Sequence, residues 1–376
     1  MKISCVFNMA PKYNEEFYVT MDKQLDCHFI IGEQFDGIKE MDKHLLSNCY
    51  VPHRINIWGN IAYEKGVLSE LRRKSPDVII STLDPYDITS WLLKVYCFFT
   101  NTALLYITHG WYGKEKGIKK LIKKVHFSNV TAFLLYGNYS KKLMIKEGFD
   151  ERKLFVLHNS LNYSSQIEIR NKRVRSNKYI EHFGNENPVI LFIGRLTKVK
   201  NLDMLLTAVA NLKQNGEDYN VCLVGDGTEK ERLQEMSCHL NIEKNVWFYG
   251  ACYDELENAE MIYNADVCVA PGNVGLTAMH CMVYGCPVIT HNNFAWQMPE
   301  FESIHEGITG AFFDYENLIS LQHTISKWFE SHKSNREEVR KACYHEIDTS
   351  WTPQYEMDVL NTALSSLKEK NNHILK

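Results

Sequence analysis

The chain has 376 residues, 45% of them hydrophobic and 23% charged, and a formal net charge of −4. This length predicts two domains, and the composition is that of a globular protein, which excludes a disordered, collagen-like or coiled-coil chain. The small negative charge argues against a nucleic-acid partner. No apolar run approaches the roughly 18 residues of a membrane span, and the N-terminal segment lacks the pattern of a signal peptide.

The 11 cysteines are scattered along the chain, and none forms a C-x-x-C pair. An odd number of cysteines without regular spacing is unlike a secreted disulfide framework, so we expect a protein of the reduced cytoplasm.

Positive charge is concentrated between residues 110 and 178, where 16 lysines and arginines accompany only 5 acidic residues. This local excess of cations predicts an anionic ligand or surface near that segment.

The first half of the chain alternates short apolar runs with amphipathic segments, a pattern typical of strands that alternate with helices. Strands are expected at residues 1–7, 28–32, 77–82, 103–109, 132–137 and 153–159. Helices are expected at residues 67–74, 88–99, 116–125 and 139–148. Strands that are apolar on both faces predict a parallel sheet covered by helices on both sides.

The second half repeats this pattern more clearly. Strands are expected at residues 189–194, 220–227, 245–250, 266–271 and 286–290. The prediction is an α/β protein with two Rossmann-like, doubly wound domains. These domains would span residues 1–165 and 189–345. The polar, aperiodic stretch 166–188 would be a linker, and residues 346–376 would form a helix that packs back on the first domain.

The segment Gly194–Lys200 (GRLTKVK) follows a predicted strand and precedes a predicted helix. In an open α/β sheet, ligands bind beyond the carboxyl ends of the strands, and a helix N-terminus favours anions. Arg195 and Lys200 in that place suit a diphosphate. The alternative is a surface loop whose two cations are only solvated.

Two further loops follow predicted strands in the same way. Gly225, Asp226 and Gly227 would allow a tight turn beside a ligand, although an ordinary strand-to-helix turn is the simpler explanation. The small-residue loop 271–276 (PGNVGL) leads into a helix whose first amides are free to bind an anion. His280 lies on that helix, where it either faces a ligand or is a structural histidine.

His109 ends a predicted strand and precedes the glycine-containing sequence Gly110-Trp111-Tyr112-Gly113. A histidine at the carboxyl end of a strand, beside a flexible loop, suits an active site. A buried structural role is equally compatible with the sequence.

Together and in this order, these loops resemble the GT-B glycosyltransferases, in particular the retaining enzymes of family 4. The resemblance is carried by FIGRLTKVKNLDMLLTA, CLVGDGTEKERL, VWFYG, IYNADVCVAP, GLTAMHCMVYGCPVI and EGITGAFF. It implies the GT-B fold, with two domains facing a central cleft. It also implies sugar transfer from a nucleoside-diphosphate sugar to a glycan or polyprenyl-linked glycan acceptor, in surface polysaccharide biosynthesis. No cofactor and no metal ion would be needed, and the choice between UDP and GDP stays open.

The resemblance also implies roles for single residues. In this family the arginine and lysine of the G-R-x-x-x-x-K segment hold the donor diphosphate, which makes Arg195 and Lys200 catalytic candidates. The first-domain histidine near the donor sugar would be His109. The implied donor-binding positions are Gly194, Gly225, Asp226, Gly227, Ala251, Cys252, Tyr253, Asn273, Val274, Gly275, Leu276, His280 and Glu302.

The chain departs from the family at one motif. The family usually carries two glutamates separated by seven residues, the first contacting the donor sugar and the second the ribose, but here these positions are Gly272 and His280. Either the donor binds through His280 and Asn273, or the protein is a catalytically degenerate copy that binds a sugar nucleotide or a partner, or the register differs. A GT-B sugar-nucleotide epimerase is a further alternative. Of two later glutamates, the spacing favours Glu302 over Glu300.

Residues 116–125 (KGIKKLIKKV) combine an apolar stripe with five lysines. A basic amphipathic helix can lie on an anionic membrane, which would place the protein peripherally on the inner face of the plasma membrane. The alternative is a helix whose apolar stripe packs into the core while its lysines are solvated.

Overall fold

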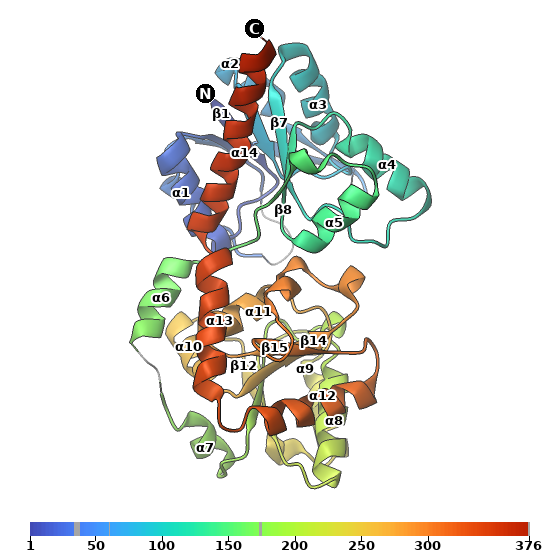
Figure 1. Ribbon diagram of the computed structural model, residues 1–376, viewed down its shortest axis with the longest axis vertical. Coiled ribbons are helices and arrows are strands. Elements are labelled where there is room, and N and C mark those ends of the chain that lie inside the picture. The colour runs from blue at the N-terminus through green and yellow to red at the C-terminus, as the bar shows by residue number, and fades with distance from the viewer. Residues whose placement is uncertain (34–37, 60, 173–174, 375–376) are drawn as a thin grey trace. The chain divides into compact units, whose positions relative to one another are not determined.

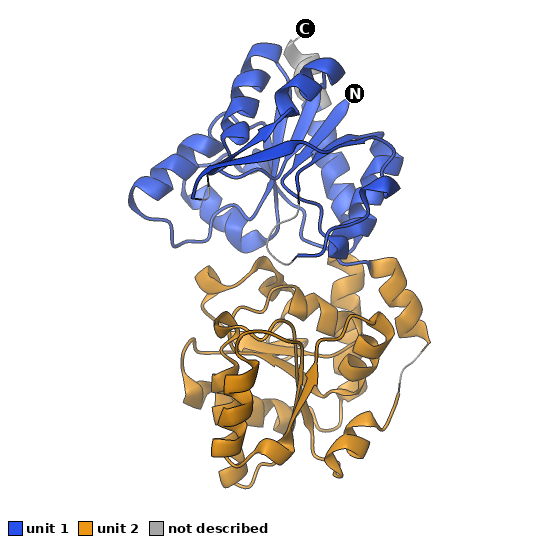
Figure 2. Ribbon diagram, turned by 180° about the vertical axis from the view of Figure 1, so that it is seen from behind, with its two compact units in different colours: residues 1–162, 352–376 blue, residues 163–351 orange. Residues whose placement is uncertain are grey.

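A computed structural model describes residues 1–33, 38–59, 61–172 and 175–374. The chain forms two compact units (Figure 2): residues 1–162 together with 352–376 make unit 1, and residues 163–351 make unit 2. Each unit is a parallel sheet flanked by helices, so the predicted fold class of two Rossmann-like domains is confirmed.

The sheet of unit 1 has seven parallel strands in the order β3-β2-β1-β6-β7-β8-β9. These strands are β1 (Ile3–Phe7), β2 (His28–Ile31), β3 (Cys49–Tyr50), β6 (Val78–Ser81), β7 (Ala103–Thr108), β8 (Ala132–Leu135) and β9 (Leu154–Val156). The helices are α1 (Glu15–Leu25), α2 (Val67–Lys74), α3 (Ile88–Thr100), α4 (Gly117–Phe127) and α5 (Asn138–Lys146). The central strands are buried, with one apolar core on each face, which explains their unbroken apolar sequences.

One feature of unit 1 was not expected. An antiparallel ladder joins β4 (His53–Trp58) to β5 (Ile61–Lys65). Most of β4 is exposed, with Trp58 82% accessible, so this strand lacks the buried apolar run by which the other strands were recognised.

The sheet of unit 2 has six parallel strands in the order β12-β11-β10-β13-β14-β15. These are β10 (Val189–Ile193), β11 (Asn220–Val224), β12 (Val246–Gly250), β13 (Val267–Ala270), β14 (Val288–His291) and β15 (Gly310–Phe313). The helices are α8 (Leu202–Gln214), α9 (Lys230–His239), α10 (Glu255–Asn264), α11 (Leu276–Val283), α12 (Leu318–Ser331) and α13 (Arg336–Ser350). The strand order reverses between β10 and β13, and such a switch point leaves a ligand crevice at the carboxyl ends of those strands.

The structure corrects the expected linker. Within residues 166–188 the chain forms most of α6 (Tyr163–Asn171) and all of α7 (Lys178–Phe183), and both helices belong to unit 2. Each helix buries a single residue, Gln166 in α6 and Tyr179 in α7. The Tyr179 ring packs edge-on against Trp247, and its hydroxyl donates to the Met261 carbonyl oxygen at 2.8 Å. One buried residue per helix leaves the segment without hydrophobic periodicity.

The C-terminal segment was predicted to form a helix that packs back on the first domain, and most of it does. Helix α14 (Pro353–Ile374) runs beside α1 in unit 1 (Figure 1), and Met357, Leu360 and Leu364 enter the apolar core there. Residues 346–350 instead end α13 in unit 2, so the chain changes units close to Trp351. In the described part of the chain, no helix combines the length and apolar character of a membrane span.

Candidate functional site

The crevice of unit 2 begins where β10 ends. The Gly194 amide donates to the Val224 carbonyl oxygen at 2.9 Å, so the chain stays close to the next strand after β10 is complete. A Cβ atom on Gly225 would overlap the Gly194 carbonyl oxygen, and one on Gly227 would overlap the Leu196 carbonyl oxygen. Close backbone packing therefore accounts for both glycines, and it fixes the segment that carries Arg195.

Lys200 is held in place at the switch point. It ends a short 3₁₀ turn, η4 (Lys198–Lys200), and its Nζ donates to both the carbonyl oxygen and Oδ1 of Asn273 at 2.8 Å. Burial and, to a lesser degree, the Arg195 cation lower the pKa of Lys200 to about 8, and the Glu300 carboxylate opposes this change. Two cations from one loop thus lie close together beside one buried carboxylate.

Arg195 is exposed, and no described residue accepts a hydrogen bond from its guanidinium group. A guanidinium group with free N–H donors can bind two oxygens of a phosphate at once. The two cations of this loop therefore differ: Lys200 is a partly buried ammonium that already donates to Asn273, whereas Arg195 is exposed and available to an incoming anion.

The loop between β13 and α11 supplies backbone donors. The Val274 amide already donates to Gln297 Oε1 at 2.9 Å, contrary to its expected role toward a ligand. No described residue accepts from the amides of Gly275 and Leu276, which begin α11. Because a helix N-terminus carries partial positive charge, these two amides add to the anion-binding character of Arg195 and Lys200.

The structure explains the glycine at position 272. Its amide donates to the Lys200 carbonyl oxygen at 3.0 Å, and a Cβ atom here would overlap the Val199 carbonyl oxygen. The β13–α11 loop packs directly on η4, so position 272 has no room for a glutamate side chain. The close approach of this loop to Lys200 thus depends on the absence of a side chain at position 272.

His280 takes part in a polar cluster that the sequence analysis missed. Glu255 Oε1, at the start of α10, lies 3.1 Å from His280 Nε2 and accepts from the Tyr284 hydroxyl at 2.7 Å and from Gln166 Nε2 at 2.9 Å. Burial raises the pKa of Glu255, but His280 and these hydrogen bonds outweigh it and bring the pKa to about 2. Glu255 is thus an anion at neutral pH. The sequence did place Glu255 two residues after the segment 251–253, which was expected to contact the base.

The remaining expected positions are spread around this edge of the sheet. Asp226 accepts from the Gly227 amide at 2.7 Å and from Lys230 at 3.3 Å, so it stabilises its own loop. Ala251 and Tyr253 are exposed beyond β12, whereas Cys252 is partly buried. Of the two later glutamates, Glu300 is the one that acts electrostatically on Lys200, and it is buried.

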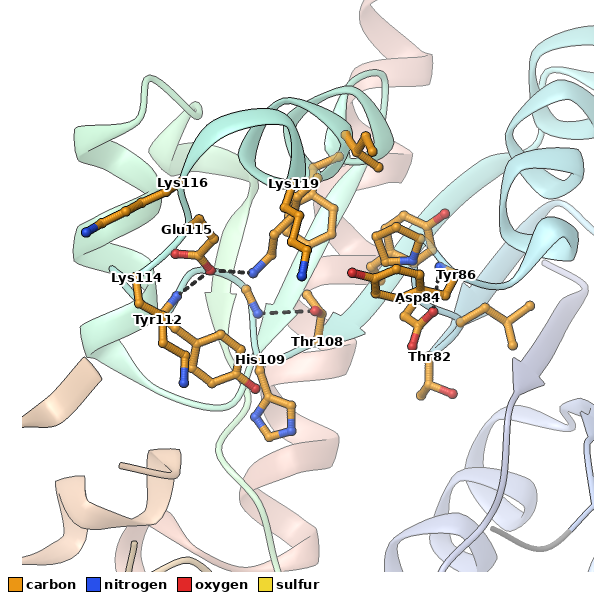
Figure 3. A pocket seen from close by; sticks show the side chains of 17 residues that line it. Thr82, Asp84, Tyr86, Thr108, His109, Tyr112, Lys114, Glu115, Lys116 and Lys119 are labelled. Atoms are coloured by element: carbon orange, nitrogen blue, oxygen red, sulfur yellow. Dashed lines mark hydrogen bonds and ion pairs between the residues drawn. The ribbon is translucent and has the colours of Figure 1, made fainter. Parts of the chain in front are cut away.

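His109 lies in unit 1, at the end of β7, and lines a cavity of about 580 Å³ (Figure 3). The cavity opens at the carboxyl ends of β6 and β7 and is bordered by Asp84, Thr108, Tyr112 and the lysines of α4. Burial and, to a lesser degree, the charge of Lys123 lower the pKa of His109 to about 4. His109 is therefore a neutral imidazole at pH 7, able to donate one hydrogen bond and accept another.

Glu115 organises the loop of this cavity. Its Oε1 accepts from the Tyr112 amide and its Oε2 from the Gly113 amide, both at 2.9 Å, and Oε1 pairs with Lys123 Nζ at 2.6 Å (Figure 3). The positive charge of Lys123 is thereby paired with the carboxylate of Glu115. Lys114, Lys116 and Lys119 also border the cavity, so its rim carries an excess of positive charge.

Known proteins of similar sequence are found for part of the chain. Residues 175–345 match the family model described as Glycosyl transferases group 1. Over 234 residues the chain is 26% identical to an uncharacterized protein of the cps region of Klebsiella pneumoniae, an alignment that covers 59% of this chain and 60% of that protein. This chain thus spans less than two thirds of that relative's length.

A second relative has a defined activity. The chain is 30% identical over 196 residues to the GalNAc-alpha-(1->4)-GalNAc-alpha-(1->3)-diNAcBac-PP-undecaprenol alpha-1,4-N-acetyl-D-galactosaminyltransferase of Campylobacter jejuni, covering 51% of this chain and 48% of that protein. Among solved structures, Anabaena HepE in complex with UDP superposes with a TM-score of 0.73 at 15% identity, over 97% of this chain and 100% of that one. The architecture is therefore the two-domain GT-B fold of glycosyltransferases.

Proposed function

We propose that this protein is a glycosyltransferase that moves a sugar from a nucleoside-diphosphate sugar to a hydroxyl group of a glycan or lipid-linked glycan, in surface polysaccharide biosynthesis. One observation carries the proposal. Arg195, Lys200 and the free amides of Gly275 and Leu276 converge at the switch point of unit 2, where a diphosphate would meet two cations and a helix N-terminus. The match of residues 175–345 to a glycosyltransferase family model supports it.

The proposed reaction breaks the bond between the anomeric carbon and the diphosphate oxygen and forms a bond from that carbon to the acceptor oxygen. Negative charge develops on the departing diphosphate, and fixed donors aimed at that charge lower the barrier. Arg195 and Lys200 are the proposed donors. In a retaining reaction of the family 4 type, the acceptor proton passes to the departing phosphate oxygen on the same face of the sugar.

The ligands named for two similar proteins suggest which nucleotide and which acceptor to test first. HepE was solved with UDP, and the Campylobacter relative is named for a diphosphate-linked undecaprenol glycan. We propose UDP as the first nucleotide to examine and a polyprenyl-diphosphate-linked glycan as the acceptor class. The lysine-rich rim of the His109 cavity is compatible with an acceptor that carries phosphate.

Titration calorimetry with UDP, GDP and ADP, followed by a transfer assay with the sugar nucleotides of the base that binds, tests the proposal. Arg195→Ala and Lys200→Ala should each lower turnover by about 10²-fold or more, because each removes a donor to the developing charge. Lys198→Ala is the matched control, since Lys198 is an exposed cation of the same turn. Binding without turnover on any acceptor would favour the degenerate alternative, and near-normal turnover in both variants would reject the assigned roles.

We also propose that unit 1 docks on an anionic membrane through α4 and α3. The apolar stripe of α4 is exposed, not packed into the core: the accessible fractions are 73% for Ile118, 60% for Leu121, 43% for Ile122 and 48% for Val125. The Lys94 ammonium donates to the Val125 and His126 carbonyl oxygens, so α3 adjoins the end of α4 (Figure 1). On α3, Phe98 and Phe99 are about four-fifths exposed.

Exposed apolar side chains flanked by lysines suit a bilayer with anionic headgroups, because the apolar groups enter the interface and the lysines meet phosphate. Sedimentation with phosphatidylglycerol vesicles should capture the protein at low salt and release it at high salt, whereas phosphatidylcholine vesicles should not capture it. The double variant Phe98→Ser/Leu121→Ser should stay in the supernatant. Ile319→Ser, at an equally exposed apolar residue of unit 2, is the control. Capture of the double variant at the wild-type level would exclude this surface.

A further inference from the structure

The ionised Glu255 is an unusual feature at the edge of unit 2. It is only one third exposed, yet its pKa lies far below that of an ordinary glutamate because one of its oxygens collects three hydrogen-bonding partners. Of these partners, Gln166 lies on α6, His280 on α11 and Tyr284 directly after α11, whereas Glu255 begins α10. Three elements thus converge to hold one carboxylate in one orientation.

The second oxygen of this carboxylate, Oε2, differs from Oε1 in its hydrogen bonding. No described residue donates a hydrogen bond to Glu255 Oε2, and none donates to or accepts from Nδ1 of His280. His280 is one fifth exposed. The cluster therefore combines a fixed anion with an unused acceptor oxygen and a neighbouring imidazole nitrogen, and both side chains are partly accessible to a ligand.

The position of the cluster indicates its ligand. His280 lies one helical turn beyond the free amides of Gly275 and Leu276, and Glu255 follows the segment 251–253 at the end of β12. The contact between Glu255 and His280 thus joins the helix that begins at the free amides to the segment that follows β12. In any nucleoside diphosphate the ribose connects these two groups, so its hydroxyls would lie at the cluster.

We propose that Glu255, oriented by His280, binds the ribose diol of the donor nucleotide. This inference rests on the proposed function, and it replaces the carboxylate that the resemblance led us to expect at position 280. The unused Oε2 of Glu255 has two lone pairs and can accept from two hydroxyls, whereas a neutral imidazole accepts only one hydrogen bond. Glu255 on α10 thereby supplies the negative charge that is absent from position 280 on α11.

Paired titrations test the inference. The nucleoside diphosphate that binds best among UDP, GDP and ADP is compared with its 2′,3′-dideoxy form, in the wild type and in Glu255→Gln. We expect the wild type to prefer the ribonucleotide by about 10- to 100-fold, because the lost bonds involve a charged acceptor. In Glu255→Gln this ratio should fall to a few-fold. A purely structural role would weaken both ligands equally and leave the ratio unchanged.

Glu257→Gln is the matched control. Glu257 lies in the same first turn of α10, but its carboxylate pairs with Tyr249 and Lys178 instead of His280. This variant removes the same charge from the same helix terminus and should keep the wild-type ratio. A wild-type protein that binds both forms equally, or a Glu255→Gln protein with an unchanged ratio, overturns the inference alone. A wild type that binds none of the three nucleotides overturns the proposed function as well.

Discussion

The depressed pKa of Lys200 predicts that nucleotide binding weakens at alkaline pH. With a pKa of about 8, Lys200 is about 90% protonated at pH 7 but only about 10% protonated at pH 9. If the ammonium contributes its charge to a bound diphosphate, the affinity should fall by about tenfold over this interval, or about 1.4 kcal/mol. The terminal phosphate of the ligand ionises near pH 6, so its own charge is constant in this range.

Titration calorimetry with UDP at pH 7, 8 and 9 measures the effect directly. At pH 8, where Lys200 is half protonated, binding should take up about half a proton, which appears when buffers of different ionisation enthalpy are compared. Lys200→Arg should abolish both effects, because a guanidinium group stays charged throughout. Lys198→Arg, in the same turn, should leave them unchanged.

Two outcomes would refute this reasoning. Wild-type affinity could be constant from pH 7 to pH 9, which would mean that Lys200 does not share the diphosphate site. Alternatively, Lys200→Arg could lose as much affinity as the wild type, which would assign the titration to another group.

Three further predictions follow from single positions. Gly272→Ala should lower the thermal midpoint of unfolding and weaken nucleotide binding together, because a Cβ atom overlaps the Val199 carbonyl oxygen and overpacking costs about 1–3 kcal/mol; a variant unchanged in both would contradict the packing argument. Glu356 is fully buried and bound to Ser160, and burial raises its pKa well above 4.5, so its stabilising contribution is complete below pH 4.5 and is lost as the pH rises through the raised pKa. Glu356→Gln should therefore melt at a higher temperature than the wild type at pH 8 but not at pH 4.5, and equal shifts at both pH values would argue against it. His109, with a pKa of about 4, stays neutral above pH 5, so the loss of transfer activity in His109→Ala should be the same at pH 6 and pH 8; unchanged activity would remove His109 from the site.

Much of the fold could be predicted because the buried strands of a doubly wound sheet have almost entirely apolar sequences. Strands β10, β11 and β13 are apolar at nearly every position, since helices cover both faces of the sheet. The cations after β10 could also be assigned to a ligand site from the sequence, because the carboxyl ends of such strands share one edge. The exposed hairpin β4–β5 and the polar helices α6 and α7 carried no comparable pattern.

The details of the candidate site depended on contacts between distant parts of the chain. Gln297 occupies the Val274 amide from 23 residues away, and Glu255 reaches His280 across 25 residues. The electrostatic effect of Glu300 on Lys200 likewise depends on a contact between residues 100 positions apart in the chain. Local sequence determined which segments are strands and where cations follow them. Only the tertiary structure decided which polar groups pair with one another and which remain for a ligand, because hydrogen bonding depends on positions that the whole sheet and its covering helices define.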